Sequence, residues 1–409
     1  MKPILFVCTF FTKKNEYRMN EDLQNLAQEN KQLTILTHPL VGNYGGMLQA
    51  YALSRSCSKI GVCPRLFNHD TGKLTVPQWR RLAQGIRDCL HLIRLNLVSA
   101  PKLYPINYKL RSIISKKFET TFFTQNQRRP PLTDSVFIVG SDQVWRCSYA
   151  AYSGGILHYF LNFVPERNIA KSISYAASFG TDEWEGTPEE TQRCGELLRQ
   201  FKAVSVREFS GVRICKEVFG VDAVQMPDPT LLATLEDYEH VINSEKTRVP
   251  KAPYFASYVL DDFPETSQLL DDLEKSTGLY HQRLMPKSTA RKRCDRFYCT
   301  VAQWLRYLRD CDAVVTDSFH GCVFSIIYNK PFVCLGNAGR GSARFDTLFQ
   351  VFGLEGRLVT SRNPEEVLHV LRQPIDWQRV NAIHEAERRR GLDFLRSNLY
   401  DGASPDEQG

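Results

Sequence analysis

Short apolar runs alternate along the chain with amphipathic stretches, and this alternation constrains the fold more than any other feature of the sequence. It is typical of α/β proteins, in which helices cover the faces of parallel sheets. We expect strands at residues 33–37, 136–139, 172–176, 203–206, 254–259, 313–316 and 331–335. We expect helices at residues 46–60, 189–201, 210–219, 267–277, 301–309, 320–328, 343–352 and 376–399.

The 409 residues are enough for two or three domains. Two prolines, Pro227 and Pro229, interrupt the alternating pattern, and a polar stretch follows them as far as Pro253. The predicted division is an N-terminal extension at residues 1–32, α/β domains at 33–232 and 250–375, and a C-terminal helix at 376–400.

The composition favours a cytoplasmic protein. No apolar run approaches the roughly 20 residues that span a bilayer, and the run from Ile4 to Phe11 lacks the cleavage site of a signal peptide. The 12 cysteines include no Cys-x-x-Cys pair. We therefore expect free thiols in a reducing compartment and no metal site.

Basic residues are concentrated in a predicted insertion at residues 73–130. Twelve lysines and arginines stand there against Asp88 and Glu119. One interpretation is a surface insertion with a solvated basic face. The other is an interfacial patch that meets anionic lipid or a phosphorylated acceptor. No nucleic-acid-binding module accompanies the charge, so we expect no nucleic-acid partner.

Ligands of parallel α/β sheets bind beyond the carboxyl ends of the strands, so the residues that follow each strand are candidates for a site. The first predicted strand is followed by a glycine-containing loop and a helix, which suit either an anion-binding site or a structural turn. Its candidate acceptor- or backbone-binding residues are Asn43, Tyr44, Gly45, Gly46 and Gln49.

The second predicted strand is followed by Asp142 and Gln143. Their side chains suit sugar hydroxyls, and Asp142 also suits the role of a base or of a helix N-cap. Arg207 follows a later strand, and its planar guanidinium suits a phosphate or a carboxylate. The alternative for Arg207 is an ion pair with Glu208 or another acid.

Two further strand ends lie in the second half of the chain. Ser318 and His320 follow the strand at 313–316, where an imidazole can transfer protons or serve a structural role. A glycine-rich loop with Arg340 and Arg344 follows the strand at 331–335. That loop is either a second anion-binding site or a solvated connection.

Five motifs in this order resemble the polysaccharide pyruvyl transferase family. They are Gly42-Asn43-Tyr44-Gly45-Gly46-Met47-Leu48-Gln49-Ala50-Tyr51-Ala52-Leu53, Gly140-Ser141-Asp142-Gln143-Val144-Trp145, Ser205-Val206-Arg207-Glu208, Asp228-Pro229-Thr230-Leu231 and Thr316-Asp317-Ser318-Phe319-His320-Gly321. The resemblance implies two Rossmann-like domains, GT-B-like, that face each other across a cleft. It also implies transfer of pyruvate from phosphoenolpyruvate to two sugar hydroxyls, which gives a cyclic ketal.

The resemblance implies roles for individual residues. His320 and Asp142 look like the catalytic pair, and Arg207 like the arginine that binds the donor phosphate or carboxylate. Many members have arginine where this chain has Ser318, so we expect Arg340 or Arg344 to supply that contact. No cofactor or metal is expected beside the phosphoenolpyruvate donor, because arginines can neutralise the leaving phosphate.

Two other functions stay open from the sequence. One is a GT-B glycosyltransferase that uses a nucleotide-sugar donor, and the other is a non-catalytic member of a polysaccharide-assembly complex. The expected acceptor is a sugar in a polysaccharide or its lipid-linked precursor. The basic segment favours peripheral contact with the anionic inner face of the membrane.

Overall fold

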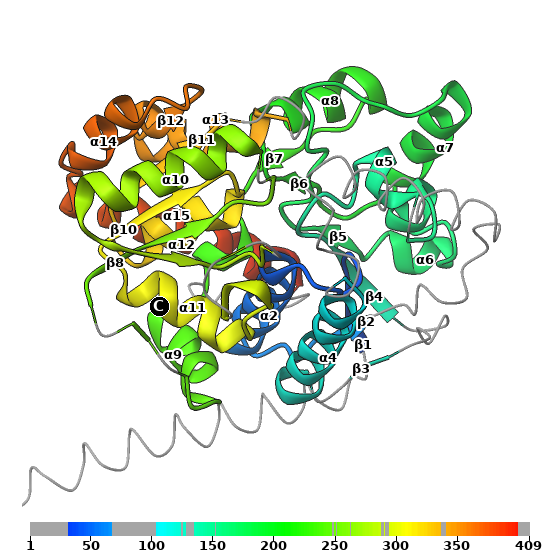
Figure 1. Cartoon of the computed structure of the whole chain (residues 1–409). Coiled ribbons are helices and arrows are strands. Elements are labelled where there is room, and N and C mark those ends of the chain that lie inside the picture. The colour runs from blue at the N-terminus through cyan, green and yellow to red at the C-terminus, as the bar shows by residue number, and fades with distance from the viewer. Residues whose placement is uncertain are drawn as a thin grey trace, which may run out of the picture.

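The computed structural model describes residues 32–67, 104–123, 126–127, 135–151, 153–247, 249–250, 252–261, 263–287, 290, 294–336 and 341–399. Two five-stranded sheets, parallel throughout, are flanked by helices (Figure 1). The predicted α/β fold class is therefore confirmed. Residues 1–31 of the predicted N-terminal extension and most of the basic segment lie outside the described residues.

The first sheet has the strand order of a Rossmann fold. Its order is β3-β2-β1-β4-β5, and its strands are β1 (Gln32–Leu36), β2 (Arg65–Phe67), β3 (Asn126–Gln127), β4 (Ser135–Val139) and β5 (Ile173–Ser174). Single parallel bridges next to β5 continue it to the paired strands β6 (Ser205–Val206) and β7 (Val224–Gln225). The strand order reverses between β1 and β4, which is where such sheets bind ligands.

The second sheet has the order β12-β11-β10-β8-β9. Its strands are β8 (Tyr254–Tyr258), β9 (Tyr280–Arg283), β10 (Ala313–Thr316), β11 (Phe332–Leu335) and β12 (Leu358–Val359). This is the other common order of doubly wound sheets, and it reverses between β8 and β10. Each half of the chain therefore has one reversal point.

The helices are α2 (Tyr44–Lys59), α4 (Tyr104–Phe122), α5 (Cys147–Ala150), α6 (Glu166–Ile169), α7 (Pro188–Leu198), α8 (Phe209–Phe219), α9 (Leu235–Asn243), α10 (Pro264–Thr277), α11 (Val301–Asp310), α12 (Phe319–Ile327), α13 (Ala343–Phe352), α14 (Pro364–Arg372) and α15 (Trp377–Leu399). In the described part of the chain, the short 3-10 helices are η1 (Ile156–Phe160), η2 (Pro229–Leu231), η3 (Cys294–Arg296) and η5 (Glu355–Arg357). Among the described residues, no helix is long and apolar enough to cross a membrane.

All seven strands and eight helices expected from the sequence are present, with ends shifted by a few residues. The polar stretch before Pro253 differs from expectation because it contains α9. Tyr238, Val241 and Ile242 of this helix recur at helical spacing and are buried, while charged residues occupy its other face. The short strands β2, β3, β7, β9 and β12 were not expected.

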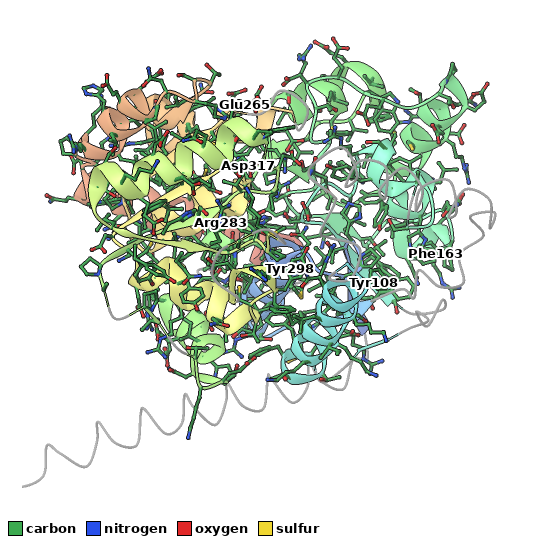
Figure 2. The ribbon with its side chains drawn as sticks, viewed as in Figure 1. Tyr108, Phe163, Glu265, Arg283, Tyr298 and Asp317 are labelled. Atoms are coloured by element: carbon green, nitrogen blue, oxygen red, sulfur yellow. The ribbon has the colours of Figure 1, made fainter. Side chains whose placement is uncertain are left out.

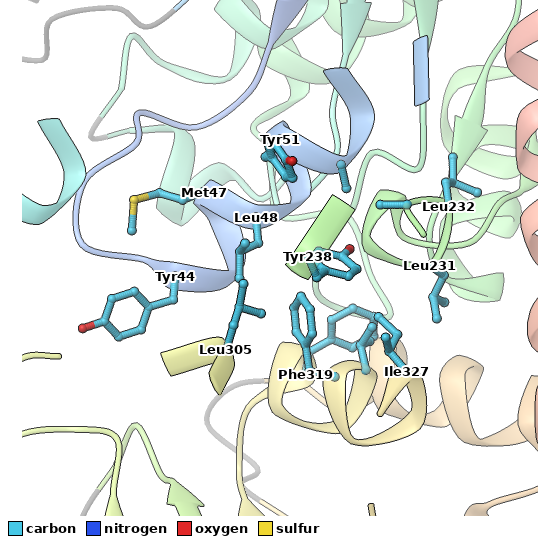
Figure 3. Packing of buried hydrophobic residues seen from close by; sticks show 14 of the residues in the cluster. Tyr44, Met47, Leu48, Tyr51, Leu231, Leu232, Tyr238, Leu305, Phe319 and Ile327 are labelled. Atoms are coloured by element: carbon cyan, nitrogen blue, oxygen red, sulfur yellow. The ribbon is translucent and has the colours of Figure 1, made fainter. Parts of the chain in front are cut away.

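Helix α2 joins the two halves. All of its first ten residues are buried, because the helix packs on both sides. Figure 3 shows Leu48 of α2 against Leu305 of α11, with Tyr238 of α9 and Phe319 of α12 in the same buried cluster. One hydrophobic core therefore continues from the first sheet into the second.

Helix α15 returns from the second half to the first. The imidazole Nε2 of His384 lies 2.9 Å from the carbonyl oxygen of Leu231, and the Arg390 side chain donates to Gln225. Gly391 packs against Tyr175 and Leu232, where a Cβ atom would lie 2.4 Å from the tyrosine oxygen. The close approach leaves no room for a side chain.

We predict that Gly391→Ala destabilises the protein. The added methyl group overpacks a buried contact, at a cost of about 1–3 kcal/mol, which outweighs the gain of about 1 kcal/mol from replacing a helical glycine. Thermal unfolding should show a lower Tm than for Gly356→Ala, because a Cβ at Gly356 meets nothing within 4 Å. Equal Tm values for the two variants would contradict this packing.

Candidate active site

The reversal points of the two sheets bring residues from both halves together. Arg207 lies 3.5 Å from Asp142, measured from Nη2 to Oδ1, and Arg207 Nη1 donates to Asp228 Oδ2 at 2.7 Å. His320 Nε2, from the second half, lies 3.7 Å from the same Asp228 oxygen. The structure thus places Asp142, Arg207 and His320 in one cluster.

Asp142 follows β4 in a left-handed backbone conformation, with φ of 64°. Aspartate tolerates this conformation better than most residues do, and such outliers are concentrated at functional sites. Its carboxylate accepts hydrogen bonds from the backbone amide of Gln143 at 2.9 Å and from the side-chain amide of Asn43 at 3.3 Å. Burial raises the pKa of Asp142, but the charges of Arg207, His320, His38 and Arg344 together outweigh it, so the net pKa is lowered and the group is ionised.

Asp228 holds Arg207 in place. Both side chains are almost completely buried, and Asp228 also accepts hydrogen bonds from Ser141 and from the backbone and hydroxyl of Thr230. Burial opposes ionisation of Asp228, yet His320, Arg207 and Thr230 hold its pKa well below the usual range. Arg207 therefore forms ion pairs with acids, as the alternative interpretation expected. The acids are Asp142 and Asp228 rather than Glu208.

Glu208 stabilises a neighbouring turn instead. Its Oε1 accepts hydrogen bonds from Ser178 Oγ at 3.1 Å and from the amides of Phe179 and Gly180 at 2.6 and 3.0 Å. The carboxylate thereby fixes the turn that follows β5. Asp228 belongs to one of the sequence motifs, but the sequence predicted no role for it. Its partners Ser141, Arg207 and His320 come from segments distant in sequence.

His320 lies in the first turn of α12 and packs on Gly45 of α2. A Cβ at position 45 would lie 2.1 Å from His320 Nδ1, so only glycine leaves space for the imidazole. The other ring nitrogen, Nε2, is buried and has no hydrogen-bond partner among the described residues. That atom faces the Arg207–Asp228 pair, 3.7 Å from Asp228 Oδ2.

The ring of the neighbouring Phe319 is close to two arginines. The guanidinium carbon of Arg207 is 4.6 Å from the ring centroid, and that of Arg344 is 5.9 Å from it. Burial, and then the like charge of Arg207, lower the pKa of Arg344 to about 10. Arg344 therefore remains charged at neutral pH, beside a second cation, and this arrangement favours an anionic ligand. Arg340 lies outside the described residues.

The remaining predicted residues support the cluster. Gln49 is buried, donates to Thr37, and accepts the Ser141 amide at 3.1 Å. The backbone amide of Gly46 donates a hydrogen bond to the side-chain oxygen of Asn43, the N-cap residue of α2. Gln143 accepts from Arg146 at 3.1 Å. Tyr44 points away from the cluster, because its hydroxyl donates to the Cys299 carbonyl at 2.6 Å.

Ser318 is the N-cap residue of α12, and its backbone amide donates to Thr316 at 3.0 Å. The preceding Asp317, labelled in Figure 2, accepts the amides of Leu260 and Asp261 at 2.7 and 3.0 Å. These bonds hold the turn between β10 and α12 against the segment that follows β8. This turn then fixes the direction in which the His320 side chain points.

His38 was not selected from the sequence. It follows β1, and its Nδ1 lies 3.2 Å from the Tyr159 hydroxyl. Burial lowers the pKa of His38, against the raising effect of the Asp142 charge, so the ring is neutral at pH 7. Within the described part of the chain, no group of three or more His, Cys, Asp or Glu is arranged to hold a metal ion.

Comparison with known families decides the assignment. The sequence matches the family described as polysaccharide pyruvyl transferase over residues 43–339, which include the whole cluster except Arg344. The chain belongs to the polysaccharide pyruvyl transferase family. It is therefore a transferase of polysaccharide biosynthesis. No match was found among curated proteins.

Several solved structures are similar to this chain. S. aureus MnaA in complex with UDP is 14% identical, with 92% of this chain and 99% of that chain covered and a TM-score of 0.45. UDP-GlcNAc 2-epimerase from Neisseria meningitidis bound to UDP-GlcNAc is 9% identical, with 90% and 99% covered and a TM-score of 0.44. The glycotransferase of kitacinnamycin is 10% identical, with 90% and 99% covered and a TM-score of 0.42.

We predict that Asp228→Asn lowers stability in a pH-dependent way. Removal of one partner from a buried ion pair costs about 3–5 kcal/mol at pH 7. Because the folded pKa of Asp228 is lowered, its contribution is present above the unfolded pKa of about 4 and is lost as the pH falls. Urea unfolding should show a difference from wild type that narrows below pH 4.

The matched control is Asp222→Asn, which removes an exposed carboxylate paired with Lys216. Exposed pairs contribute about 0–1 kcal/mol, so this variant should unfold close to wild type. A pH-independent loss for Asp228→Asn would show that its carboxylate is not ionised in the folded protein.

Proposed function

We propose that this protein transfers the pyruvyl group of phosphoenolpyruvate to two hydroxyls of a sugar, with formation of a ketal. The observation that carries the proposal is the cluster of Arg207, Arg344 and His320, formed by both halves of a chain of this family. A small ligand with two acidic groups suits two adjacent arginines.

The arginines bind the donor in this proposal. Arg207 and Arg344 receive the phosphate and the carboxylate through charge-assisted hydrogen bonds. Arg207 has a buried Nε with no hydrogen-bond partner in the described part of the chain, so it has donor capacity beyond its bond to Asp228. The cluster residues expose at most 7% of their surface, so substrates enter by separation of the two halves or rotation of side chains.

His320 supplies the proton that starts the reaction. Protonation converts carbon 3, the terminal CH2 carbon of the double bond, into a methyl group and leaves carbon 2 electron-poor. One sugar hydroxyl forms a bond to carbon 2, and the carbon–oxygen bond to phosphate then breaks. The second hydroxyl attacks carbon 2 and closes the ring. The two sugar hydroxyls lose two protons in all. These balance the proton added to carbon 3 and the proton that the departing phosphate takes up.

Asp142 orients the acceptor. Its ionised carboxylate, held by Asn43 and the Gln143 amide, accepts hydrogen bonds from sugar hydroxyls or takes a proton as one attacks. The two arginines neutralise the leaving phosphate, so the proposal includes no cofactor. The acceptor is a polysaccharide sugar or its lipid-linked precursor, and we propose a cytoplasmic enzyme with peripheral contact to the inner face of the membrane.

We predict that His320→Asn lowers kcat with phosphoenolpyruvate by about 10²–10⁴-fold, the usual contribution of a general acid. Arg344→Gln should instead raise the KM for phosphoenolpyruvate, because the ring of His320 is retained. Phosphate release with candidate glycans measures both, and circular dichroism checks the fold. Release of nucleotide from a nucleotide-sugar, without phosphate release from phosphoenolpyruvate, would support glycosyl transfer and refute the proposal.

A second prediction concerns Gly45. The methyl group of Gly45→Ala overlaps His320 Nδ1 and must displace the imidazole. We expect kcat to fall nearly as far as in His320→Asn, and the double variant to be no worse than either one. Additive losses in this double-mutant cycle would show that Gly45 does not act through His320.

A further inference from the structure

His38 is a titratable residue at the site that the mechanism does not use. It is the second residue after β1, and the pairing of β1 with β4 continues past the ends of both strands. The amide that follows β4 donates to the last carbonyl of β1 at 2.9 Å, and the Thr37 hydroxyl donates to the Ser141 carbonyl at 3.2 Å. Adjacent strands lie about 4.8 Å apart, so His38 and Asp142 leave neighbouring strands together at the reversal point of the sheet.

A chain of hydrogen bonds sets the tautomer of the His38 ring. The Tyr159 hydroxyl donates to Ser153 Oγ at 2.7 Å, and Ser153 Oγ donates to the Ala150 carbonyl at 3.5 Å. The hydroxyl hydrogen of Tyr159 is thereby used, so its oxygen accepts from His38 Nδ1, which lies 3.2 Å away. This order of donors assigns the proton of the neutral ring to Nδ1 and the lone pair to Nε2.

The lone pair on Nε2 has no hydrogen-bond partner among the residues that the structure describes, and the atom is buried. A buried polar atom without a partner is unfavourable, so Nε2 suits a ligand group that donates a hydrogen bond. A sugar hydroxyl is such a donor, whereas an ionised carboxylate is not. His38 therefore suits the acceptor sugar better than the acidic donor substrate.

The charges around His38 make its ring a better base than Asp142. Burial lowers the pKa of His38, the charge of Asp142 and the backbone of Gln143 raise it, and the charge of Arg207 lowers it; the net pKa is lowered. The pKa of Asp142 is also lowered, so its carboxylate takes up a proton only in acid. At neutral pH, the neutral imidazole is the stronger proton acceptor, and the negative charge of Asp142 stabilises the imidazolium that forms.

We propose that His38 is the base of the reaction, and that its Nε2 accepts the proton of the sugar hydroxyl that attacks carbon 2. This inference rests on the proposed function and leaves to Asp142 the orientation of that hydroxyl. His320 gives a proton to carbon 3 in the same reaction. The two histidines therefore start in opposite protonation states, His38 neutral and His320 protonated.

The protons and electrons of this step balance. The O–H bond of the first hydroxyl breaks, its proton goes to Nε2, and its electron pair forms the bond to carbon 2. When the carbon–oxygen bond to phosphate breaks, the phosphate keeps the electron pair and takes the proton from His38. The second hydroxyl closes the ring and gives its proton to His320, which has given one to carbon 3. Both histidines return to their starting states.

The first test replaces His38 with a residue that keeps the bond to Tyr159. The side-chain nitrogen of His38→Asn can replace Nδ1 as a donor, but the variant has no base. We expect kcat for phosphate release from phosphoenolpyruvate, with a glycan that supports wild-type turnover, to fall about 10²–10⁴-fold. Calorimetric affinity for phosphoenolpyruvate should match wild type, because the arginines are retained.

The matched control is His369→Asn, the same substitution at an exposed histidine of α14, which should match wild type in both measurements. Wild-type kcat in His38→Asn would show that the imidazole serves only the bond to Tyr159, and would overturn the inference.

The pH profile separates a base from a structural residue. His38 accepts a proton only when neutral, so kcat should fall as the pH drops below its pKa, which lies under the ordinary value of about 6.5. A required acid such as His320 gives the opposite slope, a loss as the pH rises. The fall on the acid side should be absent from the residual activity of His38→Gln, which has no titrating ring. Its persistence in this variant would refute the assignment.

The charged and titratable neighbours of His38 do not titrate in this range. The pKa of Asp142 is lowered by the surrounding positive charges, which outweigh its burial. The acids Asp228 and Asp142 raise the pKa of Arg207 despite its burial, and burial raises the pKa of Tyr159. A fall in kcat near pH 6 that disappears with His38 therefore belongs to His38.

The tautomer is measured without turnover and in the wild-type protein. In protein with isotopically labelled histidine, nitrogen chemical shifts distinguish protonated from unprotonated ring nitrogens, and the His38 signals are those absent from His38→Gln. We expect a protonated Nδ1 and an unprotonated Nε2 at neutral pH, and a mixture of tautomers in Tyr159→Phe, which lacks the hydroxyl. A proton on Nε2 of the neutral wild-type ring would overturn the inference. If the expected tautomer is found but wild type releases no phosphate from phosphoenolpyruvate with any glycan, the proposed function fails, and the buried acceptor at Nε2 stands.

Discussion

The burial of helix α2 on both sides is the constraint on which the rest of the structure depends. A helix that is buried all round cannot shift without opening a core, and α2 packs on the first sheet and on α9, α11 and α12 of the second half. Its N-terminus lies at the site, where Asn43 bonds to Asp142 and Gly45 packs on His320. The same helix therefore joins the two halves and sets the distance between their functional residues.

The charges of the site are arranged around this fixed element. A buried arginine is tolerated only with acids that are held in place themselves, and Asp228 meets that condition through Ser141 and Thr230. Arg207 is paired in this way, and the pair keeps it in position. Arg344 lies beside Arg207, and burial, followed by the like charge of Arg207, lowers the pKa of Arg344. Binding of an anion would relieve the repulsion between the two arginines.

Much of this organisation could be predicted from the sequence, because strand ends of parallel sheets define where ligands bind. Apolar runs of four or five residues identified β1, β4, β8, β10 and β11, and the residues after predicted strands identified Asp142, Arg207 and His320. Strand β12 offers only Leu358 and Val359 between Arg357 and Thr360, which is too little pattern to be recognised. The role of Asp228 depends on contacts with residues 87 and 92 positions away in sequence, Ser141 and His320, which no local pattern shows. Tyr44 belongs to a family motif, yet its hydroxyl bonds to Cys299, because the face of a helix that meets a distant segment is set by packing.

Ser318 illustrates how a charge can be supplied from another element. The family resemblance places an arginine at this position, at the start of α12, where it would lie on the same turn as His320. Here the serine is an N-cap residue, and the positive charge comes from Arg344 on α13, whose guanidinium carbon lies 5.9 Å from the Phe319 ring centroid, while that of Arg207 lies 4.6 Å from it. The ring attracts both guanidinium groups through cation–π interactions. Phe319 therefore helps to fix the positions of both arginines, as Asp228 does for Arg207 alone, and the positive charge of the cluster is in place without an arginine at position 318.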